Sequence, residues 1–304
     1  MNVAVEIDDY IKKKRYRQIN SVLLWQDGGF LAKCYYNGFD ENSRNVIKSV
    51  AKSITSVTAG ILLDRGALKS LDEPVYRFIP QFNEGKDPRH RMITVRHLLT
   101  MASGIYWTGG VHYHCPMLDQ MLRSGDWVGH IADIAVKDVP GTVYRYKEWD
   151  ILLLAEVLNR ICGDLYAFTN ENLYQPLGIE SAGWFRSASG TYYTVGTNEE
   201  NEKQSDLTAM EMLKIGRLFL QDGIYDDRRI LSKEYIAMAT APSAAEPGYG
   251  LMWWRGEGWY GCRGYGGQSI TVVPEKRRIA VTQATPTARG MGYDDFINYL
   301  IWEL

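Results

Sequence analysis

Ser49 and Lys52, a hydroxyl and an amine three residues apart, are the residues of this sequence best suited to chemistry. On an α-helix, side chains at positions i and i+3 share one face, with Cβ atoms about 5–6 Å apart. A serine hydroxyl becomes a good nucleophile when a base takes its proton, and a lysine whose pKa is lowered towards neutrality can be that base. The same spacing also arises by chance where the serine lies at the surface and the lysine is solvated. The rest of the chain therefore has to separate these two interpretations.

The pattern around this pair predicts a buried helix that follows two strands. Apolar residues recur at helical spacing from residue 50 to 62, which predicts a helix from Ser49 to about Asp64 that stops at Gly66. Residues 19–26 and 30–38 have the composition of two strands joined by a tight Asp-Gly-Gly turn. We further expect a short helix over residues 4–15, a polar loop over 39–45 and an extended connection over 71–80.

The middle of the chain is helical in pattern and its last 65 residues are rich in strands. Strands near both ends around a helical middle predict an α+β fold with one antiparallel sheet. We assign this sheet to residues 1–65 and 240–304, and an inserted helical lobe to residues 66–239. Helices are expected near 94–101, 117–123, 127–136, 149–161, 167–174, 207–221, 232–239 and 294–304, and strands over 249–255, 258–264, 269–274 and 278–284.

Composition and charge indicate an ordinary globular protein. The 304 residues carry 34 Lys and Arg against 36 Asp and Glu, without a basic cluster, so neither nucleic acid nor an anionic membrane is an expected partner. The N-terminal stretch has no apolar segment typical of a signal peptide, and we expect a cytoplasmic protein. The four cysteines are widely spaced, so we expect reduced thiols and neither a zinc site nor another cofactor. The oligomeric state stays open.

Six stretches spread over most of the chain carry motifs that occur together, in this order, in one superfamily: SVAKSITSVTAGILLDRGALKSLDEPV, ITVRHLLTMASGIYW, PGTVYRYKEWDILLLAEVLNRICG, LYQPLGIESAGW, SDLTAMEMLKIGRLFLQDG and GYGGQSITVVPEK. The chain resembles the serine hydrolases related to class C β-lactamases, penicillin-binding proteins and DD-peptidases. It is most similar to the branch that includes 6-aminohexanoate-dimer hydrolase and other esterase-like members. The resemblance implies a β-lactamase/transpeptidase-like fold in which the Ser49 helix lies between the sheet and the helical lobe.

The second motif of that superfamily is Y-x-N, and the resemblance places Tyr146 at its tyrosine and Glu148 where asparagine usually stands. A phenol at this position can pass a proton from the nucleophile to the leaving group. Tyr144 is the rival candidate. A carboxylate at residue 148 can either pair with Lys52 and keep it charged, which removes it as a base, or accept its hydrogen bond and orient it.

The third motif is K-T-G in β-lactamases, and the equivalent stretch here is Cys262-Arg263-Gly264. The lysine that binds a β-lactam carboxylate is therefore absent, and Arg263 is expected to point away from the cleft because successive strand residues face opposite sides. Gly264 would let a substrate approach the strand, and the resemblance makes the N–H groups of Ser49 and Tyr265 the oxyanion hole. Cys262 as a nucleophile is the alternative to a buried strand cysteine.

These motifs predict a serine hydrolase that cleaves a small amide or ester through an acyl-enzyme, with weak or no β-lactamase activity. Ser49 is the expected nucleophile, Lys52 the base and Tyr146 the proton relay. A Ser-His-Asp triad is not indicated, because no G-x-S-x-G turn is present. The competing hypothesis is a non-catalytic binding or sensor module that keeps the fold. Four residues of the loop after residue 104 are candidates for substrate contact: Tyr106, Trp107, His112 and Tyr113.

Overall fold

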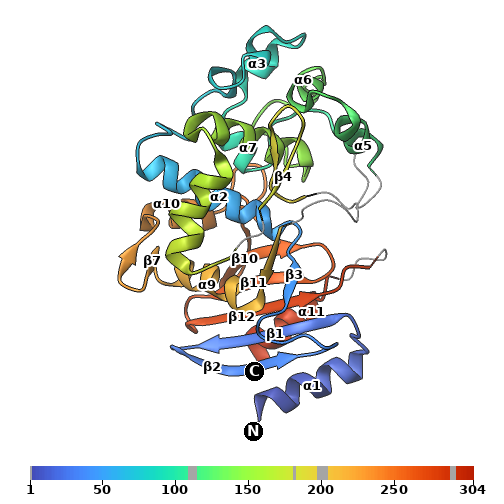
Figure 1. Cartoon of the computed structure of the whole chain (residues 1–304), viewed down its shortest axis with the longest axis vertical. Helices are drawn as coiled ribbons and strands as arrows, with labels where there is room; N and C mark the ends of the chain where they lie inside the picture. The colour runs from blue at the N-terminus through green and yellow to red at the C-terminus, as the bar shows by residue number, and fades with distance from the viewer. Residues whose placement is uncertain (1, 109–114, 181–182, 197–204, 288–291) are drawn as a thin grey trace.

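A computed structural model describes residues 2–108, 115–180, 183–196, 205–287 and 292–304 of the chain. Its centre is a six-stranded antiparallel sheet in the order β2-β1-β12-β11-β10-β9 (Figure 1). The first two strands come from the beginning of the chain and the other four from its end. The strands are β1 (Ile19–Gln26), β2 (Gly29–Tyr35), β9 (Trp254–Gly256), β10 (Trp259–Gly264), β11 (Gln268–Val273) and β12 (Arg278–Ala284).

Each face of the sheet packs against helices, because neighbouring residues of a strand point to opposite sides. In β1, Leu23 and Trp25 belong to the large core shared with α2 (Val50–Asp64) and α9 (Ala209–Leu220). Val22 and Leu24 belong to a smaller core on the other face, with residues of the N-terminal helix and of the C-terminal helical segment. These covering elements are α1 (Val3–Lys14), α11 (Asp294–Asn298) and the π-type turns η5 (Tyr299–Glu303).

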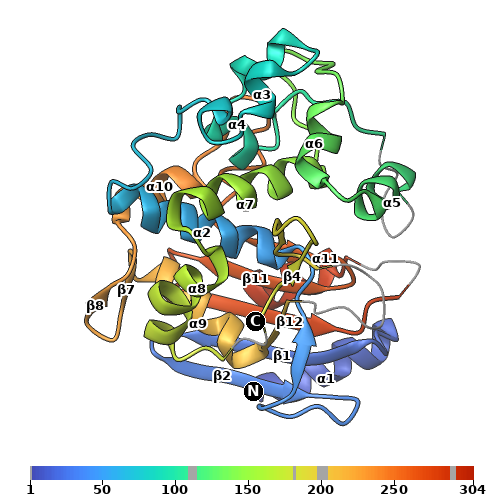
Figure 2. The same ribbon diagram turned by 45° about the horizontal axis from the view of Figure 1, so that its top comes forward.

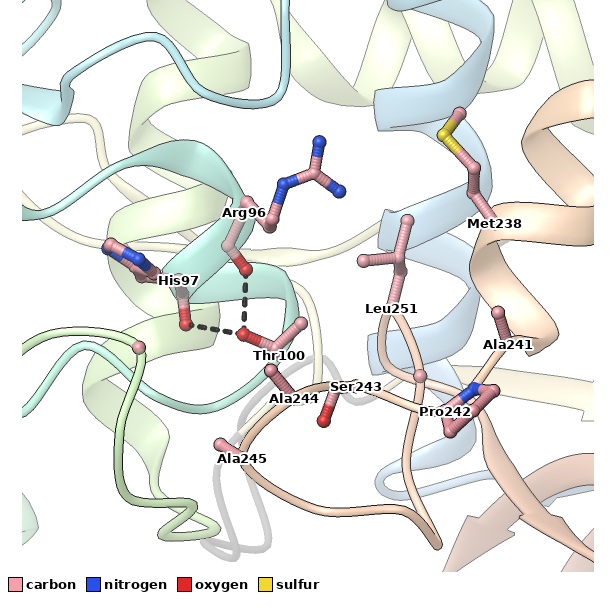
Figure 3. Close-up of a pocket in the computed structure, with 12 residues that line it drawn as sticks. Arg96, His97, Thr100, Met238, Ala241, Pro242, Ser243, Ala244, Ala245 and Leu251 are labelled. Carbon is pink, nitrogen blue, oxygen red and sulfur yellow. Dashed lines mark hydrogen bonds between the residues drawn. The ribbon is translucent and has the colours of Figure 1, made fainter.

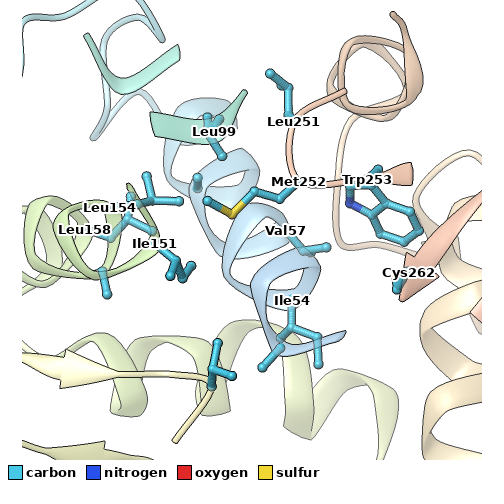
Figure 4. Packing of buried hydrophobic residues seen from close by; sticks show 14 of the residues in the cluster. Ile54, Val57, Leu99, Ile151, Leu154, Leu158, Leu251, Met252, Trp253 and Cys262 are labelled. Carbon is cyan, nitrogen blue, oxygen red and sulfur yellow. The ribbon is translucent and has the colours of Figure 1, made fainter. Parts of the chain in front are cut away.

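Helix α2 lies between the sheet and the upper helices (Figure 2). On one side, Ile54 and Val57 lie near Trp253 and Cys262 at the sheet, and on the other side α7 (Glu148–Cys162) brings Ile151 and Leu154 (Figure 4). Residues 50–62 of α2 are all buried, so this is a central helix rather than a surface one. The remaining α-helices are α3 (Gln81–Glu84), α4 (Val95–Leu99), α5 (Pro116–Arg123), α6 (Trp127–Ala132), α8 (Leu165–Thr169) and α10 (Lys233–Thr240).

The predicted α+β layout with its single main sheet is confirmed. The predicted polar loop at 39–45 is wrong at its end, because β3 (Arg44–Val46) is a strand that pairs with β6 (Asp206–Thr208). The expected helix at 207–221 is wrong at its start, because β6 occupies residues 206–208 and α9 begins at Ala209. The extended connection contains a 3₁₀ turn at Val75–Arg77, and the expected strand at 249–255 is limited to β9.

The division of the chain into a sheet part (1–65 and 240–304) and a helical lobe (66–239) stays a prediction. Helix α9 falls in the range assigned to the helical lobe, but it packs against the sheet. None of the helices described by the structure is long and apolar enough to cross a membrane.

Candidate active site

Ser49 stands at the N-terminal end of α2, in the cap position. A serine there usually accepts a hydrogen bond from the helix backbone, but the Ser49 side chain makes no such cap. Its Oγ instead accepts a hydrogen bond from Nζ of Lys52 at 3.0 Å. The preceding residue, Lys48, has φ of 49°, a left-handed conformation that is uncommon for residues other than glycine and that often marks a functional site. The Ser49 hydroxyl therefore contacts a side chain instead of capping the helix backbone.

Lys52 is buried, with only 1% of its side chain exposed, so the interpretation as a solvated surface lysine is wrong. Besides Ser49, its Nζ contacts Oε1 of Glu148 at 2.8 Å. Burial lowers the pKa of Lys52, but the Glu148 carboxylate beside it raises the pKa above the ordinary lysine value. The raised pKa favours the ion pair that keeps Lys52 charged, and the same contact also orients the amine towards Ser49.

Glu148 is the first residue of α7, and its other oxygen is also occupied. Tyr193, from the two-residue strand β5 (Tyr192–Tyr193) that pairs with β4 (Phe185–Arg186), donates its hydroxyl to Oε2 at 2.8 Å. Burial and the Glu148 carboxylate raise the pKa of Tyr193 well above its usual value, so this phenol stays protonated at neutral pH. Sequence reasoning missed Tyr193, since one of 20 tyrosines outside any motif carries no signal of its own.

Tyr146 lies against the same pair, with Lys52 Nζ 4.9 Å from the centre of its ring. Burial raises the pKa of Tyr146, whereas the Lys52 charge and hydrogen bonds to Ser49 and Lys52 lower it, and the net direction is upward. Its ring stacks on Trp254 at 5.9 Å between centroids. Tyr144 packs on Tyr249, and its buried hydroxyl has no hydrogen-bond partner among the described residues. Of the two tyrosine candidates, Tyr146 is the one beside Ser49 and Lys52.

The end of β10 runs along the entry to α2. A Cβ atom at Gly264 would collide with the carbonyl oxygen of Ile47, two residues before Ser49, which explains the need for glycine. Arg263 points to the opposite face, where its guanidinium lies 4.7 Å from the ring centre of Trp259 and donates to Thr271. The Tyr265 phenol donates to the carbonyl of Thr287 at 2.6 Å, so the hydroxyl is directed at the 287 backbone.

Cys262 is fully buried between the sheet and α2, and burial raises the pKa of its thiol to about 12. A protonated, enclosed thiol is a poor nucleophile. It can support α2 through packing.

Trp107 is half-buried and packs edge-to-face on Trp149, with ring centres 4.7 Å apart. Trp149 follows Glu148 in α7 and donates its indole N–H to the carbonyl of Tyr106. The loop after residue 104 is thus attached to the helix that carries Glu148. The candidates His112 and Tyr113 lie outside the described residues.

A separate cavity of about 280 Å³ lies between α4, α10 and residues 241–251 (Figure 3). The hydroxyls in its wall are those of Thr100 and Ser243, and both donate to backbone carbonyls. The described residues that form the wall include none of those that surround Ser49. The hydrogen-bonded cluster at the start of α2, not this cavity, is the part of the described structure suited to covalent chemistry.

Comparisons with known proteins agree with the fold. The family model described as Beta-lactamase matches residues 7–303. Protein Rv1367c of Mycobacterium tuberculosis (strain ATCC 25618 / H37Rv) is 24% identical over 76% of this chain and 67% of its own length. A protein of Bacteroides dorei DSM 17855 assigned as a beta-lactamase superposes with a TM-score of 0.78 at 17% identity, covering 99% of this chain and 98% of the other. A Bacillus anthracis protein assigned as a 6-aminohexanoate-dimer hydrolase superposes with a TM-score of 0.75 at 18% identity, covering 97% of this chain and 80% of the other. At these identities the solved structures show a shared fold and leave the substrate open.

Proposed function

Because the chain belongs to the beta-lactamase family, we propose that it is a serine hydrolase that cleaves an amide or ester bond through an acyl-enzyme on Ser49. The observation that carries the proposal is the 3.0 Å hydrogen bond between Ser49 Oγ and Nζ of the buried Lys52. A nucleophile in hydrogen-bond contact with an amine, itself fixed by a third group, is the usual arrangement of an activated serine.

In this proposal Ser49 Oγ attacks the substrate carbonyl and its proton leaves through Lys52. The N–H groups of Ser49 and Tyr265 stabilise the oxyanion, each donor contributing about 2.7–4 kcal/mol in comparable sites. Tyr146 then gives a proton to the departing amine or alkoxide. A water molecule hydrolyses the acyl-enzyme by the same steps in reverse order.

The substrate is expected to be a small amide or ester rather than a β-lactam. Cys262 replaces the cation that would hold a β-lactam carboxylate, and Arg263 points to the other face of the sheet. Trp107 and the aromatic rings around Tyr146 are the proposed contacts for an uncharged substrate.

A binding or sensor module is the second candidate, and one observation favours it. The ion pair with Glu148 keeps Lys52 as an ammonium ion, which has no free electron pair to accept the serine proton. Such a protein would bind, or acylate slowly, without turnover.

The test is labelling with a fluorophosphonate probe followed by mass spectrometry, together with release of nitrophenol from short-chain p-nitrophenyl esters. We expect the label on Ser49, and no label and no hydrolysis in Ser49→Ala. Ser53→Ala is the matched control, because Ser53 lies on the same helix but donates its hydroxyl to the carbonyl of Met252. Labelling without ester release would favour the sensor module, and hydrolysis by folded Ser49→Ala would refute the mechanism.

A further inference from the structure

Four side chains from three parts of the chain form one continuous line of hydrogen bonds at the site. The Tyr193 hydroxyl donates to Oε2 of Glu148 at 2.8 Å, and Oε1 of the same carboxylate accepts from Lys52 Nζ at 2.8 Å. Lys52 Nζ also contacts Ser49 Oγ at 3.0 Å. The amine therefore stands between the serine hydroxyl and a carboxylate, within hydrogen-bond distance of both.

This arrangement leaves the serine proton without an acceptor if Lys52 has to supply one by itself. The pKa of Lys52 is raised, so its amine carries three protons at neutral pH. The pKa of Tyr146 is also raised, so its phenol is protonated as well. Among the described residues, Glu148 is the carboxylate that is paired with Lys52. It is the group in this cluster that can accept a proton.

We propose that Glu148 is the proton acceptor for acylation and that Lys52 conducts the proton to it from Ser49. This inference rests on the proposed function, because it assigns the proton path of the same reaction. As Ser49 Oγ bonds to the carbonyl carbon, its O–H bond breaks and the proton moves to Lys52 Nζ. In the same step one N–H proton of Lys52 moves to Oε1 of Glu148. Lys52 remains an ammonium ion, and Glu148 becomes a neutral acid.

The collapse of the tetrahedral intermediate returns the proton through Lys52 and Tyr146, which also hydrogen-bond each other. The bond from the carbonyl carbon to the leaving nitrogen or oxygen breaks, and Tyr146 donates its phenolic proton to the leaving atom. Lys52 replaces that proton on Tyr146, and Glu148 returns its own to Lys52. The serine proton thus ends on the leaving group, and all three side chains regain their starting states.

The groups that face this pair fix the charge balance of the path. They are the phenols of Tyr146, Tyr193 and Tyr249. Further out, Cys115 lies near Tyr193, and Lys48 precedes Ser49 in the chain. The three phenols have raised pKa values and stay neutral in the physiological range. The neighbouring ion pair between Lys147 and Asp150, at the start of α7, is fully buried, and Asp150 also accepts a hydrogen bond from Ser103. The two opposite charges of this pair neutralise each other. The proton exchange between Lys52 and Glu148 leaves the total charge of the cluster unchanged.

Replacement of Glu148 separates this path from one in which neutral Lys52 is the base. If Lys52 must lose its proton first, Glu148→Gln removes the carboxylate that keeps it charged, and hydrolysis at pH 7 becomes faster. If Glu148 accepts the proton, Glu148→Gln removes the acceptor, and hydrolysis at pH 7 becomes slower. The two paths therefore predict changes of opposite sign.

The experiment measures kcat/KM for a p-nitrophenyl ester from pH 5 to pH 10, and the rate of fluorophosphonate labelling of Ser49, in the whole chain. We expect Glu148→Gln to lose at least about a hundredfold at pH 7, with the acid limb of the profile moved to higher pH. Glu148→Asp keeps a carboxylate and should lose less, with the acid limb where it is in the unmodified protein. Tyr193→Phe removes the hydrogen bond to Oε2 and leaves Oε1 facing Lys52, so its loss of rate should also be smaller than that of Glu148→Gln.

An equal or faster rate at pH 7 in Glu148→Gln, or an unchanged acid limb, would overturn the inference. Thermal unfolding of each variant checks that it is folded. Should Glu148→Gln fail this check, Glu148→Asp becomes the deciding variant, and a faster rate than that of the unmodified protein refutes the proposal. The proposed function fails separately, through absence of Ser49 labelling and ester release in the unmodified protein.

Discussion

The hydroxyl of Tyr146 is hydrogen-bonded and, within the part of the chain that the structure describes, that of Tyr144 is not, so replacing each tyrosine by phenylalanine should affect different properties of the protein. Tyr146→Phe should reduce activity, and Tyr144→Phe should increase stability. The Tyr146 hydroxyl lies beside Ser49 and Lys52, whereas the buried hydroxyl of Tyr144 has no partner among the described residues. Tyr146→Phe should lower kcat/KM by at least about a hundredfold, the usual scale of a lost proton donor. At about 1.36 kcal/mol per tenfold, this is about 2.7 kcal/mol of transition-state stabilisation. Tyr144→Phe should leave kcat/KM nearly unchanged.

Tyr144→Phe should increase the stability of the folded protein. A buried polar group without a partner costs about 1–3 kcal/mol, so removal of this hydroxyl should raise the free energy of unfolding by up to that amount. Unfolding entropy near 2.1 cal/mol/K per residue gives about 0.64 kcal/mol/K for a chain of 304 residues. The melting temperature of Tyr144→Phe should then rise by about 2–5 °C.

The assay is ester hydrolysis and differential scanning calorimetry on the two variants and the unmodified protein. Retained activity in Tyr146→Phe with lost activity in Tyr144→Phe would show that the proton relay is the other tyrosine. A lower melting temperature in Tyr144→Phe would show that its hydroxyl has a partner, such as an ordered water, and would refute the stability argument.

Two further predictions concern substrate choice and the core. Nitrocefin hydrolysis should be slow or absent while short-chain esters are cleaved, because Cys262 stands where β-lactamases have a lysine. The missing charge-assisted hydrogen bond contributes roughly 1.5–3 kcal/mol, or about one to two orders of magnitude in rate. Efficient nitrocefin hydrolysis in a colorimetric assay would contradict this prediction. Asp150→Ala should lower the free energy of unfolding by about 3–5 kcal/mol, since it leaves the fully buried Lys147 charge unpaired. Chemical denaturation should also show that adding Lys147→Met to Asp150→Ala recovers part of this loss, and a single variant as stable as the unmodified protein would contradict the reasoning.

Local pattern was enough to predict α2, α7 and β10, which carry most of the site. The spacing of Ser49 and Lys52 fixes a shared helix face, and the turn at residues 27–29 joins β1 to β2 as expected. The alternation of β10 also predicts that Arg263 points away from α2 while Cys262 faces it, and the structure has both residues in these positions. These features depend on the period of a helix or strand, which is a property of neighbouring residues.

The charge state of the site and two of its partners required the tertiary structure. Lys52 and Glu148 are 96 residues apart in sequence, and Tyr193 is a further 45 residues away from Glu148. Strand β3 similarly forms only because β6 reaches it from about 160 residues downstream, since three residues have too few local interactions to fix a strand. Motif position alone leaves open whether Glu148 orients Lys52 or holds it charged, because both depend on distance and burial. The packing of α7 against α2 supplies that distance and burial, since it brings the Glu148 carboxylate within 2.8 Å of the buried Lys52 amine.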